Sequence, residues 1–321
     1  MRRPLVLLSL PLLMLAAACA QTGSTPTAAG GATSPDHRWE GFSQRATEAA
    51  EAWRPDPTWT RGYVPLEGPT VLTGDPRFTP DTELAYQAGW YRAQVPLPGG
   101  RPADGTIRFP DGTLTVPLVS AADAYRELDQ GDPPPCEERP QSPPPRTKGG
   151  PTIEPGPDGW VTGPPQSACT PLTITAVRLD TAPVRTSRGE ARVPAWLFTV
   201  QELAVPVARL AVAPQATGAA PEGSTPQRGA PDGVVGAQDL QEVDGDRVTY
   251  RLGVGACDTG ITPLVQERDD VVVVGGGVTR ASGICTDQLK LAPVTVTLKA
   301  PLGARPVLDV LTGAPLRLAP R

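Results

Sequence analysis

A chain of 321 residues with a formal net charge of −5 is long enough for one or two domains. Its acidic balance and its lack of a Lys/Arg cluster exclude the usual nucleic-acid-binding proteins. With 41 Pro and 34 Gly, the chain is expected to have long irregular connections, but it keeps enough Val, Leu and Trp for a core.

The first residues have the pattern of an export signal. Met1, Arg2 and Arg3 form a short basic head, and an apolar run over residues 4–18 follows. This run falls short of the roughly 20 residues needed to span a bilayer and is typical of a secretory signal peptide. Residues 1–18 are therefore predicted to direct export and to be removed.

Cys19 follows the apolar run directly. The segment Leu15-Ala16-Ala17-Ala18-Cys19 resembles the lipobox of bacterial lipoproteins, although its Leu lies one residue further from the Cys than in the commonest pattern. The resemblance implies that Cys19 receives fatty-acyl chains such as palmitate and anchors the protein to the outer face of the cell membrane. The alternative is ordinary signal cleavage after Ala18 or Ala20. We expect lipidation of Cys19.

A tether separates this cysteine from the rest of the chain. Residues 19–37 are rich in Thr, Ser, Gly and Ala and are expected to be flexible. Asn is absent and Lys is rare, a bias toward residues with GC-rich codons. Together, signal, tether and residue usage resemble the lipoproteins of unknown function in high-GC Gram-positive (actinobacterial) envelopes. The resemblance assigns no activity to residues 38–321.

The cysteine count fits an exported protein. The chain has five cysteines: Cys19, Cys136, Cys169, Cys257 and Cys285. Lipidation of Cys19 leaves four, which allow three pairings. We favour Cys136–Cys169 and Cys257–Cys285, because each bridge then stays inside one half of the chain. Zinc is the alternative, but no CxxC spacing exists and His37 is the single histidine.

Residues 38–213 are expected to form a β-rich domain with a few helices. Apolar residues at helical spacing predict a helix over residues 42–53, ending before Pro55, with Trp53 in the core. Over residues 84–90 the apolar alternation favours a strand, although Thr79-Pro80 also reads as a helix start.

Clearer signals follow along the chain. Strands over residues 107–109 and 114–119 around Asp111-Gly112 predict a hairpin. Ser120 is expected to cap a short helix, with Asp123 as its capping-box partner. Later strands are predicted over residues 172–175, 192–200 with Trp196 in the core, and 205–212, with Pro194 and Pro206 at edges or bulges.

Residues 131–168 are rich in proline and are expected to form an irregular insertion. A Cys136–Cys169 bridge would close this insertion at its base. Trp160 lies within it and is the candidate contact with a protein or cell-envelope partner. The alternative is that the whole insertion is solvated.

Residues 214–233 are predicted to be a linker, and residues 234–321 a second β domain of four or five strands. The expected strands cover residues 247–254, 271–274, 294–298 and 307–310. The Gly residues at 253, 255 and 275–277 are interpreted as turn glycines, since none belongs to a dinucleotide-binding GxGxxG pattern. The expected fold is mainly β with a few short helices, in two small antiparallel domains that are sandwich- or barrel-like.

The search for catalytic groups gives mainly exclusions. Residues 38–321 contain no His, and the chain has no GxSxG or SxxK motif, which excludes the familiar acyl-transfer mechanisms. Glu242, Asp244 and Asp246 alternate around a tight turn and could bind Ca²⁺, but Asp-Gly is also what such a turn needs on steric grounds. We therefore expect no metal or organic cofactor and assign no catalytic residue.

Two classes of function stay open. The first is a non-catalytic binding or envelope-interaction module, favoured because no catalytic groups converge in the sequence. The second is a hydrolase that uses only carboxylates and acts on cell-wall glycans. A pocket with two close acids of perturbed pKa would favour the hydrolase.

Overall fold

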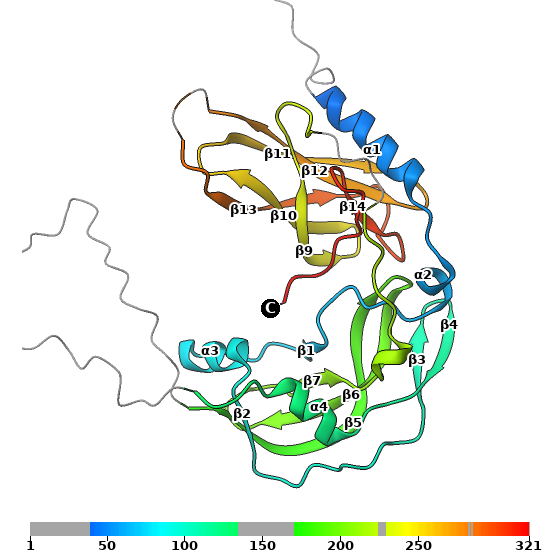
Figure 1. Ribbon diagram of the computed structural model, residues 1–321, viewed down its shortest axis with the longest axis vertical. Coiled ribbons are helices and arrows are strands. Elements are labelled where there is room, and N and C mark those ends of the chain that lie inside the picture. Colours follow the sequence, from blue (N-terminus) through cyan, green and yellow to red (C-terminus); the bar gives the residue numbers. More distant parts are fainter. Residues whose placement is uncertain (1–38, 134–169, 224–228, 282, 284, 321) are drawn as a thin grey trace, which may run out of the picture. The chain divides into compact units, whose positions relative to one another are not determined.

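The computed structural model describes residues 39–133, 170–223, 229–281, 283 and 285–320 (Figure 1). The following predicted features lie outside these residues: the signal peptide 1–18, Cys19, the tether 19–37, most of the insertion 131–168, Cys136, Cys169 and Trp160. They stay predictions. No helix within the described ranges is long and apolar enough to cross a membrane.

A seven-stranded sheet is built from residues 70–210. Its longest strands form an antiparallel pair that turns at Ser187-Arg188, and both are longer than the sequence predicted. One further strand, β2, joins this pair in parallel. The strands are β1 (Thr70–Leu72), β2 (Tyr91–Ala93), β3 (Gly105–Phe109), β4 (Gly112–Val116), β5 (Leu172–Thr186), β6 (Gly189–Val200) and β7 (Val207–Leu210).

The hairpin and the capped helix that follows it are confirmed. β3 and β4 pair antiparallel with Phe109 opposite Gly112, so the turn lies one residue earlier than predicted. The Ser120 side chain accepts a hydrogen bond from the backbone N–H of Asp123 at 3.1 Å and begins α4 (Ala121–Leu128). Trp196 is buried and its indole N–H donates to the carbonyl of Val119 at 3.0 Å.

The strand predicted over residues 84–90 is wrong, because α3 (Pro80–Ala88) forms there instead. The Thr79 N–H donates to the Thr82 hydroxyl at 2.8 Å, and the Thr82 N–H donates to the Thr79 hydroxyl at 3.3 Å. Gly89, with φ of 71°, ends the helix in the left-handed region. This reciprocal cap and the glycine stop outweigh the short alternation of apolar residues.

Two further sheets are built from residues 234–309. The strands predicted over residues 247–254, 271–274, 294–298 and 307–310 are confirmed within them. The β9–β10 hairpin turns at Gly245-Asp246, with Gly245 at φ of 58°. One sheet holds β9 (Ala237–Asp244), β10 (Arg247–Gly255) and β13 (Leu289–Thr297); the other holds β8 (Val234–Val235), β11 (Thr259–Glu267), β12 (Val272–Thr279) and β14 (Val307–Asp309).

The interpretation of the Gly residues at 253, 255 and 275–277 as turn glycines is wrong. Gly253 and Gly255 belong to β10, and Gly275, Gly276 and Gly277 lie inside the buried strand β12. A methyl group on Gly276 would come within 2.3 Å of the Leu252 side chain. These glycines therefore allow close packing on both faces of β12.

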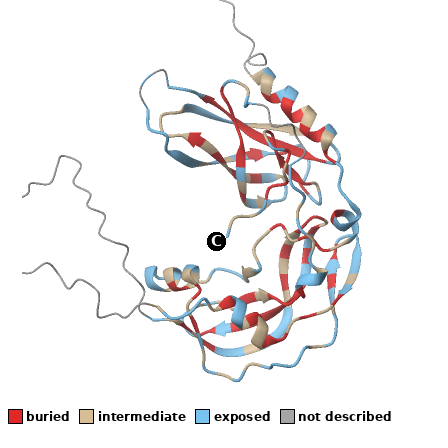
Figure 2. Ribbon diagram, viewed as in Figure 1, coloured by how far each residue is buried: buried red, intermediate tan, exposed pale blue. Residues whose placement is uncertain are grey.

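The helix predicted over residues 42–53 is confirmed as α1 (Glu40–Ala52), and its buried residues lie along one side (Figure 2). That side packs against β12 and β11. Trp53 is buried at its end and meets the ring of Trp59, in α2 (Pro57–Arg61), edge-on at 5.1 Å.

The buried apolar residues form three clusters. Two of them divide along the predicted linker, one within residues 63–212 and one within residues 235–316. The third combines α1, Trp59, Val64 and Leu66 with Val234 and residues 271–310, although α1 was predicted to belong to the domain of residues 38–213. The boundary at residues 214–233 stays a prediction. The fold class is confirmed: the described residues are mainly β, with four short helices and curled sheets.

The predicted Cys257–Cys285 disulfide is present, with a sequence separation of 28 residues. A bridge that closes a loop of this length is worth about 3–4 kcal/mol in the chain-entropy description. We expect Cys257→Ser to lower the free energy of unfolding by that amount and to increase hydrogen exchange in residues 234–321 more than in residues 38–213. Urea unfolding with exchange mass spectrometry measures both.

Cys285→Ser is the matched control, since it breaks the same bridge and should reproduce the Cys257→Ser shift. Equal unfolding midpoints for the oxidised protein and the variant would contradict a stabilising role for this bridge.

Candidate functional site

A cavity of about 250 Å³ lies where five segments of the chain meet. Its lining comes from residues 67–72, Tyr86, the β5–β6 pair, β9 and residues 318–320. We call it the Arg185 cavity, after the one cation among its lining residues.

Backbone hydrogen bonds hold these segments together. The Leu66 N–H donates to the carbonyl of Arg185 at 2.8 Å, and the Glu67 carboxylate accepts the N–H of Arg185. The Leu318 N–H donates to the carbonyl of Leu66 at 2.6 Å, and the Leu240 N–H donates to that of Arg317 at 2.9 Å. Residues 315–320 thus connect β9 with the segment beside β5.

Arg185 is the distinctive group of this cavity. Its guanidinium makes no hydrogen bond or ion pair with any residue that the structure describes, and its Nε atom is sealed from solvent. Burial lowers the pKa of Arg185, and the nearby carboxylates of Glu67 and Glu190 oppose that shift without overcoming it. A partly buried guanidinium whose Nε has neither water nor a protein partner is costly, so its position calls for an explanation.

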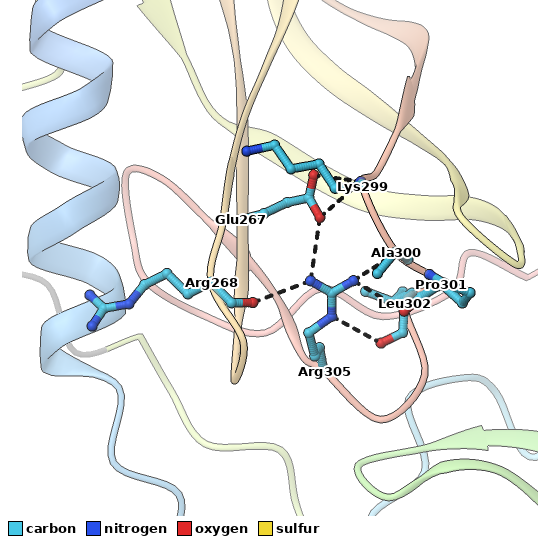
Figure 3. A network of polar contacts seen from close by, with 7 residues as sticks. All are labelled: Glu267, Arg268, Lys299, Ala300, Pro301, Leu302 and Arg305. Atoms are coloured by element: carbon cyan, nitrogen blue, oxygen red, sulfur yellow. Dashed lines mark hydrogen bonds and ion pairs between the residues drawn. The ribbon is translucent and has the colours of Figure 1, made fainter.

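Arg305 shows how the same protein satisfies another largely buried guanidinium (Figure 3). It contacts the Glu267 carboxylate at 3.4 Å, and Glu267 in turn accepts the backbone N–H of Lys299 at 2.9 Å. Its remaining donors reach backbone carbonyls at 2.9–3.3 Å: those of Arg268, Ala300, Pro301 and Leu302. The two arginines differ in their partners: the guanidinium of Arg305 links several segments of the chain, whereas that of Arg185 contacts no described polar group.

The two arginines should therefore respond in opposite ways to replacement by methionine, which keeps the apolar stem. Arg305→Met removes the cation that pairs with Glu267 and the donors to several backbone carbonyls, and should lower the free energy of unfolding by about 3 kcal/mol. Arg185→Met removes a desolvated charge and should leave that free energy unchanged or raise it by about 1 kcal/mol. Denaturant unfolding of the two variants measures the difference. If Arg185→Met lowered the free energy of unfolding as much as Arg305→Met, Arg185 would have a structural role and would not be kept for a ligand.

Three carboxylates accompany Arg185 in the lining: those of Glu67, Glu190 and Glu242. Glu190 lies directly opposite Arg185 across the β5–β6 pair. Glu242 comes from β9, and both Glu190 and Glu242 are exposed. Acidic groups and one guanidinium therefore face the same small space.

The predicted calcium candidates do not come together. Glu242 lines the Arg185 cavity, whereas Asp244 ends β9 and Asp246 lies in the turn that follows. Among the residues that the structure describes, no three His, Cys, Asp or Glu side chains are grouped closely enough to hold a metal ion. The alternation that the sequence showed is explained by the hairpin itself.

A second cavity, of about 720 Å³, is lined mainly by apolar residues and prolines. The hydroxyl of Tyr63 beside it has no hydrogen-bond partner in the described part of the chain, and burial raises the pKa of Tyr63. This second cavity has two cations, and both have partners among the described residues. Arg209 is held by Glu127 at 2.8 Å and by Thr70 at 3.0 Å, and Arg317 donates to the backbone carbonyl of Glu67 at 3.4 Å. Because the guanidinium of Arg185 has no such partner, the Arg185 cavity is the better candidate for a charged ligand.

Asp309 is a buried acid that lies outside both cavities. Its carboxylate accepts the N–H of Ala237 at 2.8 Å and both the N–H and the hydroxyl of Thr312 at 2.9 and 2.8 Å. Burial raises the pKa of Asp309, and these hydrogen bonds oppose that shift. The group joins β14 to β9 and is structural.

Sequence reasoning did not single out Arg185, Glu67 or Glu190. Arg185 lies in a strand beside Val184 and Thr186 with nothing in its neighbours to mark it. Comparison of the chain with models of known protein families, with curated proteins and with solved structures found no match.

Proposed function

We propose that this protein is a lipid-anchored, extracytoplasmic, non-catalytic binding module that holds a small ligand in the Arg185 cavity. The observation that carries the proposal is the guanidinium of Arg185, which lines a cavity without any partner among the described residues. Its terminal nitrogens have no partner among the described residues, so a ligand carboxylate would gain hydrogen bonds there without breaking any that the described residues make. The anchor at Cys19 would keep the ligand near the membrane.

A carboxylate-dependent hydrolase acting on cell-wall glycans is the second candidate. It is favoured by the presence of Glu67, Glu190 and Glu242 in one cavity. Against it, a cavity of about 250 Å³ is smaller than the usual 300–1,000 Å³ of ligand pockets and has little room for a glycan chain.

Filling the cavity tests the proposal directly. Gly68 lines it and has open space where a side chain would begin, so Gly68→Trp should occupy the cavity with little strain. Gly99 also has open space and lies outside the cavity, so Gly99→Trp is the matched control. We expect ligand-observed NMR of a library of small charged molecules to show binders that the Gly99→Trp protein retains and the Gly68→Trp protein loses.

The same spectra distinguish binding from hydrolysis. Unchanged ligand after long incubation supports a binding module. Product signals that vanish in Glu190→Gln or Glu242→Gln protein would establish the hydrolase instead. A library without a single binder that depends on the cavity would contradict the binding module.

A further inference from the structure

We propose that the Arg185 cavity binds a small zwitterion, a free α-amino acid, with the carboxylate on Arg185 and the ammonium group beside Glu190 and Glu242. This inference rests on the proposed function and names the ligand class of the same cavity. Three features of the site lead to it: the unpartnered cation, the excess of carboxylates and the volume.

The cation selects a carboxylate. A guanidinium is planar and presents a fork of N–H donors that matches the two oxygens of a carboxylate. Only Nε of Arg185 is among the sealed, unpartnered atoms, so its terminal nitrogens are the part that a ligand in the cavity can reach. No described carboxylate lies within ion-pair distance of this guanidinium, which leaves the fork open for a ligand.

The surrounding acids exclude a simple anion. Besides Arg185, the lining carries the exposed carboxylates of Glu190 and Glu242, so the cavity does not offer a net positive charge to a simple anion. A simple cation would in turn meet the positive charge of Arg185. Glu190 lies across the strand pair from Arg185 and Glu242 approaches from β9, so the positive and negative sides of the lining come from different elements. A molecule with one charge of each sign complements both sides.

The volume of the Arg185 cavity limits the size of its ligand. A cavity of about 250 Å³ is below the range of drug-sized ligand sites. A single amino acid carries both charges on one carbon atom and is small enough for such a space. A peptide or glycan chain would have to extend far outside it.

The experiment uses matched ligands on the mature, folded protein. A panel of individual α-amino acids of both hands is titrated by calorimetry, followed by the carboxamide and the N-acetyl derivative of each binder. The carboxamide lacks the carboxylate and the N-acetyl derivative lacks the ammonium group. We expect at least one free amino acid to bind, and each derivative to bind about 10- to 100-fold more weakly, as for a lost charged hydrogen bond.

Variants locate the two charges. Arg185→Met should weaken binding of the free amino acid by a similar factor of about 10–100 without lowering the unfolding midpoint. Glu190→Gln and Glu242→Gln should weaken binding of the free amino acid. They should leave the already weak binding of its N-acetyl derivative unchanged, because that derivative has no ammonium group. Arg192→Met, an exposed position on β6 outside the cavity, is the matched control and should bind as wild type.

Each other result would overturn the inference. Equal affinity for the N-acetyl derivative would identify an anion site, and equal affinity for the carboxamide a cation site; both would leave the binding module intact. A third result is that no amino acid binds, while another small molecule binds the wild type and is lost in Gly68→Trp. The amino-acid inference is then wrong, and the proposed binding function stands. If nothing binds in either experiment, the proposed function fails with it.

Discussion

Gly276→Leu is expected to lower the free energy of unfolding by about 3 kcal/mol or more, because it forces a side chain into a filled core. A Cβ atom at this position would lie 2.3 Å from one methyl group of Leu252 and 3.1 Å from the Val235 side chain. Leu252 is fully buried, so it cannot swing into solvent. Overpacking a dense interior costs about 1–3 kcal/mol even for single methylene groups.

Chemical denaturation followed by tryptophan fluorescence measures this loss. Gly283→Leu is the control, since Gly283 is exposed and a side chain there would meet nothing within 4 Å. An unfolding midpoint for Gly276→Leu equal to that of the control would show that β12 is not packed as described.

Cys19→Ala is expected to separate the protein from the membrane. If the acyl chains on Cys19 supply the attachment, the variant accumulates either as an unprocessed precursor or as a soluble protein in the medium. Two acyl chains hold a protein stably at a bilayer, whereas the polar tether of residues 19–37 has no comparable apolar surface. Cell fractionation with immunoblotting distinguishes the two outcomes.

Cys257→Ser provides the matched control, because it also removes a cysteine but leaves the lipobox-like segment intact. That variant should remain in the membrane fraction. Finding Cys19→Ala protein at mature size in the membrane fraction would refute lipidation as the anchor.

Several strands and helix ends could be predicted, because the residue pattern that specifies each of them lies within a few neighbouring residues. The strict alternation over residues 294–298 and the Ser120 cap each specify their own structure within a few residues. β12 was harder, because its three glycines resemble a turn until the partners that need them, Leu252 above all, are known. α3 was missed because a weak alternation was preferred to the reciprocal cap at Thr79.

The candidate site could not be predicted for a physical reason. The lining of the Arg185 cavity comes from segments that lie up to about 250 residues apart, and no motif connects them. What distinguishes Arg185 is the absence of a partner, and a sequence does not show which charges are paired. Glu242 was identified, but as part of a calcium group with Asp244 and Asp246 that the hairpin keeps apart.

The packing of α1 on β11 and β12 has a consequence for the order of events during synthesis. The hydroxyl of Thr47 meets the side chain of Gln266 at 3.4 Å across a separation of 219 residues. At ribosomal rates of about 5–20 residues per second, roughly 10–45 s pass between the synthesis of these two partners. Throughout that interval the apolar side of α1, with Phe42 and Ala46, has no surface to cover it. The N-terminal helix is therefore expected to stay without its tertiary contacts until β11 and β12, the strands that receive it, have been made.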